Sequence, residues 1–190
     1  MIESNGIVAT GSVRRKYQLQ WKRPDLEIVD LRGNVPTRLE KLGKGAWHAI
    51  VLARAGLDRL GLIKPGIVEF QGRQFPIAAL PREIFIPAGG QGIIALQIRA
   101  GDDRVKVMAE AINHFETRLC LRAEREFLRL LEGDCDQPVG VLATMDKRIM
   151  KIRAQVFDPG STQPRQAEID GASEDAESLA RNLFEKIKTS

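Results

Sequence analysis

Short apolar runs alternate with amphipathic stretches along the first third of the chain. The apolar runs cover residues 6–10, 26–31 and 49–53, and their length and continuous apolar character predict buried β-strands. Between and after them we expect a helix following the Gly11-Ser12 turn, a second over Val35–Leu42, and a third that runs to Leu60. This alternation favours a doubly wound α/β domain, in which helices cover both faces of a parallel sheet. Ligands bind such sheets beyond the carboxyl ends of the strands.

The pattern changes in the middle of the chain. Prolines and glycines interrupt residues 63–90, which predicts a loop-rich segment with a short hairpin formed by residues 68–70 and 73–75. Residues 92–99 then form a strongly apolar stretch that predicts a strand, although no partner strand is evident. We therefore expect an α/β domain over residues 1–78 and a connecting segment over 79–104.

Residues 105–190 have the pattern of a small α+β domain. A helix is expected over 102–111, and Asn113 with Glu116 resembles a capping box that opens a second helix running to Glu132 and ending at Gly133. Antiparallel strands are predicted over 139–145, 149–157 and 167–169. Ser173 is expected to cap a final helix whose apolar face carries leucines and an isoleucine, at positions 179, 183 and 187.

Composition narrows the class of protein. The chain has 190 residues, of which 43% are hydrophobic and 28% charged, as in ordinary soluble proteins. No apolar run reaches the roughly 18 residues that cross a bilayer, and the first five residues do not resemble an export signal. Cys120 and Cys135 suggest neither a disulfide framework nor, with His48 and His114, a zinc site. We therefore expect a cytoplasmic protein with no membrane partner and no bound metal.

The net charge of +4 and the isoelectric point of about 9.3 favour anionic partners. Nucleic acid is disfavoured, because aromatic residues make up only 5% of the chain, no nucleic-acid motif is present, and the basic residues are spread through alternating helices and strands. Small anionic ligands fit the pattern better.

Arginines gather at the predicted strand ends. Arg14 and Arg15 follow Ser12 in the first turn of a helix, where two cations oppose the macrodipole but free backbone N–H groups favour an anion. Arg32 and Arg38 lie at the next strand-to-helix turn, and Arg59 lies farther on. Converging guanidinium groups could bind several carboxylates. The alternative is that each is an ordinary solvated surface residue.

Cys135 lies in a turn between Asp134 and Asp136, beyond a predicted helix end. Negative neighbours should raise the pKa of this thiol, which argues against a redox or protease-type nucleophile. The simplest interpretation is that Cys135 is an unreactive cysteine. Cys120, between two leucines in mid-helix, is expected to be structural.

Several blocks of the chain together resemble porphobilinogen deaminase (hydroxymethylbilane synthase). They occur in the family's order and extend over nearly the whole chain. The blocks are Thr10-Gly11-Ser12-Val13-Arg14-Arg15, Leu31-Arg32-Gly33-Asn34-Val35, Thr37-Arg38-Leu39, Ala55-Gly56-Leu57-Asp58-Arg59-Leu60-Gly61-Leu62, Gln91-Gly92, Asn113-His114, Ala123-Glu124-Arg125 and the Cys135 loop.

The resemblance implies a periplasmic-binding-protein-like first domain and a transferase activity in tetrapyrrole and haem biosynthesis. Cys135 would hold a dipyrromethane cofactor through a thioether, and porphobilinogen units would be condensed onto it to give hydroxymethylbilane. By position, Ser12, Arg14 and Arg15 would bind cofactor carboxylates. Arg32, Arg38 and Arg59 would bind the incoming substrate or the growing polypyrrole.

The resemblance also implies a gap, because the family has three domains and its catalytic aspartate lies on the N-terminal one, which this chain lacks. In the family, the strand after Gln91-Gly92 joins the sheet of that first domain, so residues 93–98 should here present an exposed apolar edge. We therefore expect a truncated or split deaminase that needs a complementary N-terminal chain. A non-catalytic anion-binding or regulatory module, or a defective gene product, are the alternatives.

Overall fold

The computed structural model describes residues 2–45, 47–131 and 138–189. It divides into two compact units. The first comprises the described parts of 1–86, 135–139 and 156–164, and the second those of 87–134, 140–155 and 165–190. No helix in these described ranges is both long and apolar enough to cross a membrane.

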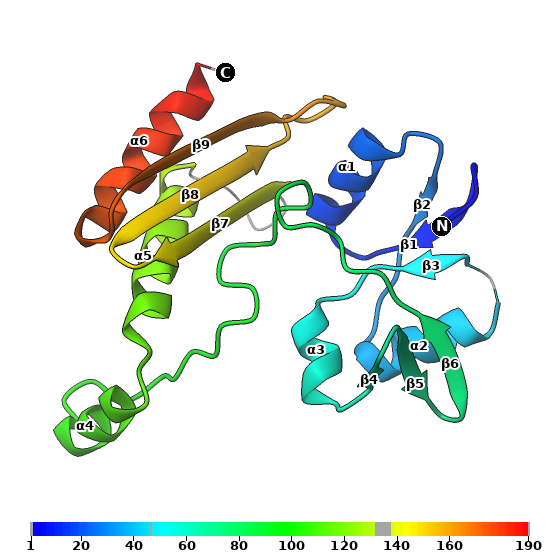
Figure 1. Cartoon of the computed structure of the whole chain (residues 1–190), viewed down its shortest axis with the longest axis horizontal. Helices are drawn as coiled ribbons and strands as arrows, with labels where there is room; N and C mark the ends of the chain where they lie inside the picture. Colours follow the sequence, from blue (N-terminus) through cyan, green and yellow to red (C-terminus); the bar gives the residue numbers. More distant parts are fainter. Residues whose placement is uncertain (1, 46, 132–137, 190) are drawn as a thin grey trace. The chain divides into compact units, whose positions relative to one another are not determined.

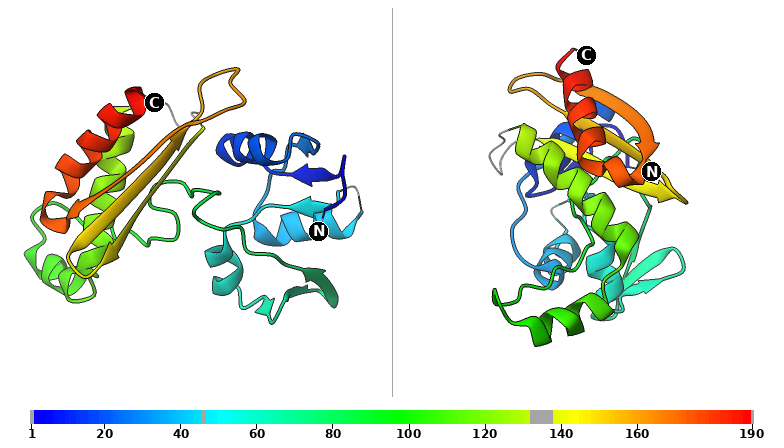
Figure 2. Two further views of the ribbon diagram at one scale, coloured as in Figure 1. Left: turned by 45° about the horizontal axis from the view of Figure 1, so that its top comes forward. Right: turned by 90° about the vertical axis from the view of Figure 1, so that its left-hand side faces the viewer.

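A small parallel sheet forms the centre of the first unit. Strand β1 (Ile7–Ala9) lies between β2 (Glu27–Val29) and β3 (Ala49–Ile50), and both neighbours run parallel to it. Helices α1 (Val13–Lys22) and α2 (Val35–Gly43) cover opposite faces of the sheet (Figures 1 and 2). The predicted parallel α/β arrangement is confirmed. Since the strand order is β2-β1-β3, the chain reverses its direction of winding between β1 and β3, which is where ligands bind sheets of this kind.

An antiparallel sheet completes the first unit. Its strands are β4 (Ile63–Lys64), β5 (Ile67–Phe70) and β6 (Arg73–Pro76), in the order β4-β5-β6. The predicted hairpin is therefore confirmed, and it turns at Gln71 and Gly72, both with positive φ. Val68 of β5 is buried with Leu39 of α2 and Leu57 of helix α3 (Arg54–Arg59), so the hairpin shares a core with the helices around the parallel sheet.

Three aromatic rings link α1 to the segment 156–164 within the first unit. The ring of Phe157 lies 5.5 Å from that of Tyr17 and 6.2 Å from that of Trp21. The indole N–H of Trp21 donates to Gln163 at 2.8 Å. Phe157 is 2% exposed, so this cluster is part of the core.

The second unit is a three-stranded sheet with helices on one face (Figures 1 and 2). Strands β7 (Val139–Asp146), β8 (Ile149–Val156) and β9 (Arg165–Ala172) are hydrogen-bonded in that order. Helices α5 (Phe115–Leu130) and α6 (Ala176–Lys188) pack on the sheet, with Phe127, Leu183 and Ile187 fully buried. The predicted α+β class is confirmed for this unit.

Two predicted helix caps are wrong. The N-cap of α5 is His114, whose Nδ1 accepts from the N–H of Thr117 at 3.2 Å. Asn113 lies one residue before the cap position, and its own N–H closes the end of helix α4 (Asp103–Ala111) on the carbonyl of Glu110. Ser173 lies in a 3₁₀ turn (Ser173–Asp175), and α6 begins only after Asp175. The predicted helix end at Glu132 and Gly133 lies outside the described residues.

The strand predicted over residues 92–99 is not formed. A strand requires a partner to accept and donate ladder hydrogen bonds, and the described part of the chain supplies none to this segment. The expected exposure of its apolar side chains is confirmed, since Ile94 is 72% and Leu96 58% exposed. The neighbouring α4 buries none of its residues, and its Met108 is 63% exposed.

Candidate functional site

The turn after β1 forms the start of the candidate site in the first unit. Ser12 has extended backbone angles and caps α1, and its Oγ accepts from the N–H of Arg15 at 3.4 Å. A Cβ atom at Gly11 would collide with the carbonyl oxygen of Leu31, at the end of the β2 segment. Glycine therefore lets the first turn of α1 lie directly beside the neighbouring strand end.

Arg15 reaches from this turn to the third strand end. Its Nη1 donates to the carbonyl of Val51, just after β3, at 2.8 Å. Burial lowers the pKa of Arg15 from its ordinary value, and the positive charge of Arg38 lowers it further. The two guanidinium groups thus lie close enough to repel each other at the carboxyl edge of the parallel sheet. A bound carboxylate would relieve this repulsion.

Arg38 is oriented by the turn into α2. Its Nε donates to the carbonyl of Gly33 at 2.6 Å, and Gly33 has a φ of 120°, a conformation that favours glycine. Asn34 caps the helix by accepting from the N–H of Thr37 at 3.0 Å. The Leu31–Thr37 turn therefore folds around Arg38 and leaves its guanidinium at the sheet edge.

The structure places the other predicted arginines differently. Arg32 has a side chain 80% exposed and pairs with Asp30 at 3.2 Å, and Arg59 lies exposed in the last turn of α3. Arg14 is 7% exposed and donates to the carbonyl of Ile86 at 2.6 Å and to Gln18 at 3.1 Å. Burial, followed by the charge of Arg15, lowers the pKa of Arg14 to about 10. Of the predicted residues, the structure brings together Ser12, Arg15 and Arg38.

Cys135 lies outside the described residues. The next described residue is Pro138, whose carbonyl accepts a hydrogen bond from the N–H of Phe157 at 3.2 Å. This bond belongs to the first unit, in which Phe157 also packs on α1.

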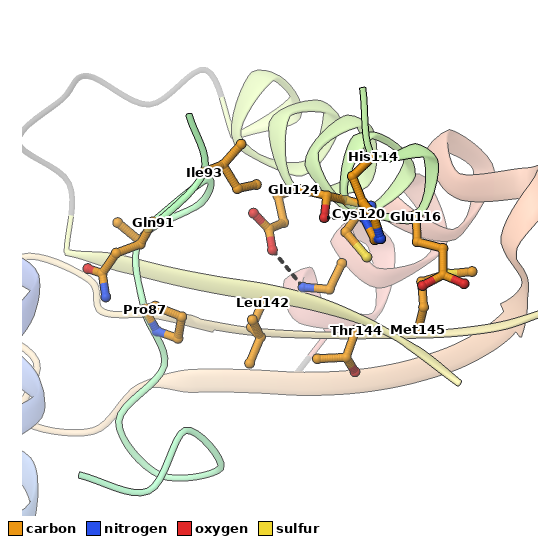
Figure 3. Close-up of a pocket in the computed structure, with 13 residues that line it drawn as sticks. Pro87, Gln91, Ile93, His114, Glu116, Cys120, Glu124, Leu142, Thr144 and Met145 are labelled. Atoms are coloured by element: carbon orange, nitrogen blue, oxygen red, sulfur yellow. Dashed lines mark hydrogen bonds between the residues drawn. The ribbon is translucent and has the colours of Figure 1, made fainter. Parts of the chain in front are cut away.

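A second concave site, which the sequence did not predict, lies within the second unit. It is a cavity of about 350 Å³ between α5, β7 and the segment that begins at Pro87 (Figure 3). Glu124 of α5 is 4% exposed, and its carboxylate accepts from the N–H groups of Gly90 at 2.6 Å and Ala143 at 2.8 Å. Burial raises the pKa of Glu124. The sequence does carry one signal for this site: Glu124 places a carboxylate on the apolar face of α5, directly after the buried Ala123.

Cys120 lines the same cavity and is half-buried. Burial raises the pKa of its thiol to about 11, with further contributions from the negative charges of Glu124 and Glu116. A thiol with this pKa remains protonated at neutral pH and is a poor nucleophile. The geometry agrees with the structural role expected for Cys120.

Comparison with known proteins agrees with the geometry. The family model described as "Porphobilinogen deaminase, dipyromethane cofactor binding domain" matches residues 1–107, and that of the "Porphobilinogen deaminase, C-terminal domain" matches residues 118–189. The chain is 44% identical over 180 residues to a porphobilinogen deaminase of Moorella thermoacetica, an alignment that covers 95% of this chain and 54% of that protein. The chain thus spans about half the length of this curated relative. Two consecutive family domains over most of its length show that the chain belongs to the porphobilinogen deaminase family.

Proposed function

We propose that this chain is part of a porphobilinogen deaminase (hydroxymethylbilane synthase), a cytoplasmic transferase of tetrapyrrole and haem biosynthesis. The enzyme would condense porphobilinogen units onto a cysteine-linked dipyrromethane to give hydroxymethylbilane. The observation that carries the proposal is the convergence of Ser12, Arg15 and Arg38 at the carboxyl edge of the parallel sheet, within the segment that matches the family's cofactor-binding domain. A periplasmic-binding-protein-like fold for the first unit is part of this proposal.

The donor set suits the cofactor. Each pyrrole ring carries an acetate and a propionate, so a dipyrromethane presents several carboxylates that guanidinium forks bind bidentately. Arg15, in the first turn of α1, would hold cofactor carboxylates together with Ser12. Arg14 would assist from the interior, where it orders the helix by its bond to Ile86. Bound to Cys135, the cofactor would supply the pyrrole carbon onto which new units are added.

The remaining arginines would serve the substrate and the growing chain. The positive charge of Arg38 acts on Arg15, so the two arginines could share the carboxylates of the growing chain. Arg32 and Arg59 are both exposed. Arg32 can turn toward porphobilinogen at little energetic cost, because a solvated ion pair such as Arg32–Asp30 contributes only about 0–1 kcal/mol.

The catalytic aspartate of the family would come from sequence that this chain does not match. We propose that this other part, provided as a complementary N-terminal polypeptide, pairs with residues 93–98 and covers Ile94 and Leu96. The almost continuous apolar run of that segment is typical of a buried strand. The chain spans about half of its relative, so the complementary half is large enough to supply a sheet.

Intact mass tests the assignment. The chain would be co-expressed with the part of the Moorella thermoacetica protein that it does not match. It would then be purified, and its intact mass would be measured by mass spectrometry. We expect added mass equal to a dipyrromethane, lost in Cys135→Ser and retained in the matched control Cys120→Ser. An unmodified wild-type chain under these conditions would refute the deaminase role and favour a non-catalytic anion-binding module. An adduct that survives Cys135→Ser would refute the attachment site.

A further inference from the structure

The turn that precedes the exposed segment is held closely by the second unit. The carbonyl of Pro87 accepts from the N–H of Val141, in β7, at 3.0 Å. A Cβ atom at Gly89 would lie 2.8 Å from the Cδ1 atom of Leu128 and 3.0 Å from Val141, so the backbone lies directly on these side chains. Gly90 follows with a φ of 73°. Residues 87–90 therefore lie in contact with both α5 and β7.

Glu124 is the polar group that joins these three elements (Figure 3). β7 is an edge strand of its sheet, and alternate N–H groups along an edge point away from the neighbouring strand. Two of them find acceptors here, since Val141 donates to Pro87 and Ala143 donates to Glu124. The second oxygen of Glu124 accepts from Gly90. One buried carboxylate thus completes the edge of β7 and holds the turn.

The contact continues from Glu124 to the exposed segment. The N–H of Ile93 donates to the carbonyl of Gly90 at 3.1 Å, so the first residue of the segment is bonded to the residue that Glu124 holds. The next apolar side chain, that of Ile94, is 72% exposed. The position at which the exposed segment begins is therefore set by the Glu124–Gly90 bond.

We propose that Glu124 is a positioning residue that holds the Ala88–Gly92 turn against β7 and so presents residues 93–98 for pairing with the rest of the deaminase. The proposal rests on the function proposed above, in which that segment is the docking strand. Holding the start of a docking strand in place reduces the conformational entropy lost on binding. Charge-assisted hydrogen bonds to a buried carboxylate are strong enough for this task.

Amide hydrogen exchange of the free chain tests the contact. Glu124→Gln keeps the size of the side chain but replaces one accepting oxygen by an NH₂ group, which leaves a buried N–H without an acceptor. We expect exchange at Gly90 and Ile93 to become about tenfold faster or more, with amides of β8 unchanged. Glu116→Gln, on the same helix and lining the same cavity but exposed, is the matched control and should exchange like wild type. Wild-type exchange at Gly90 in Glu124→Gln would overturn the proposal.

Binding to the unmatched part of the Moorella thermoacetica protein, measured by calorimetry, tests the consequence. Glu124→Gln should bind at least several-fold more weakly than wild type. Leu183→Val, a buried substitution in α6, should lower the thermal stability of the unit while leaving this affinity unchanged. Equal affinities for wild type and Glu124→Gln would refute positioning, whereas failure of the wild-type chain to bind would refute the docking function and leave the exchange result to decide whether Glu124 holds the turn.

Discussion

The aromatic cluster on α1 gives the most quantitative prediction. Phe157 is 2% exposed and packs against Tyr17 and Trp21, at ring distances of 5.5 and 6.2 Å. Replacing a buried phenylalanine by alanine costs about 3–5 kcal/mol through lost transfer free energy and the cavity that remains. Of this, each aromatic pair accounts for about 0.5–1.5 kcal/mol. Phe157→Ala should therefore lower the free energy of unfolding of the first unit by about 3–5 kcal/mol.

Urea unfolding followed by tryptophan fluorescence measures this change. Trp21 lies in the cluster itself and reports on the first unit, and a Trp47→Phe background removes the other tryptophan of the chain. Leu80→Ala is the control within the same unit, because Leu80 is 44% exposed and its truncation should change the free energy of unfolding by no more than about 0.5 kcal/mol.

A loss below about 1 kcal/mol for Phe157→Ala would refute the reasoning, since that is the size of an ordinary substitution. So would equal losses for the two variants. The result bears on function because α1 carries Ser12 and Arg15 at its N-terminus. If the cluster holds this helix, the variant should also lose the anion site at urea concentrations at which the wild type keeps it.

Three further predictions concern single groups. In a Cys135→Ser background at pH 8, Cys120 should react with iodoacetamide about a hundredfold more slowly in the folded chain than in urea, because its pKa is raised to about 11. Equal reaction rates in the two states, measured by mass spectrometry, would contradict the burial of this thiol. Glu126 accepts from Arg129 and Arg181, and these bonds lower its pKa, so its stabilising contribution is present above the ordinary glutamate pKa of about 4.3 and is lost as the pH falls through the lower value in the folded state. Glu126→Gln should therefore show a smaller drop in melting temperature between pH 6 and pH 3 than wild type, and a drop as large as that of wild type would exclude this contribution. Ile94→Ser should leave the free energy of unfolding within about 0.5 kcal/mol of wild type, because Ile94 is 72% exposed, yet weaken binding to the complementary polypeptide; unchanged binding by calorimetry would remove Ile94 from the docking strand.

The pattern of apolar residues was sufficient to predict most elements of the fold. The runs at residues 6–10 and 26–31 form β1 and β2, and the periodic positions 179, 183 and 187 form the buried face of α6. These predictions hold because burial of a strand or of one helix face depends on residues close together in the sequence. The caps at Asn113 and Ser173 were wrong because α5 begins at Phe115 and α6 at Ala176, so that His114 and Asp175 occupy the cap positions.

The candidate site was only partly predictable for a similar reason. That arginines follow the strand ends is visible in the sequence, but which of them face one another depends on the turns. Arg15 and Arg38 converge, whereas Arg14, the immediate neighbour of Arg15, points into the interior toward Ile86, 72 residues away. Adjacent helical residues project in directions about 100° apart, so one lies at the sheet edge and the other beneath it.

By itself, the sequence determined the class of each unit, most strand and helix segments, the net positive charge of the chain and the family to which it belongs. Tertiary structure alone decided that Glu124 joins Gly90 to Ala143, that Phe157 packs on α1, and that residues 93–98 form no strand. The physical reason is that periodicity encodes which face of an element is buried, whereas hydrogen bonds and ring contacts between distant segments exist only once the elements have packed. A strand, in particular, is completed by a partner, and its own residues cannot supply one.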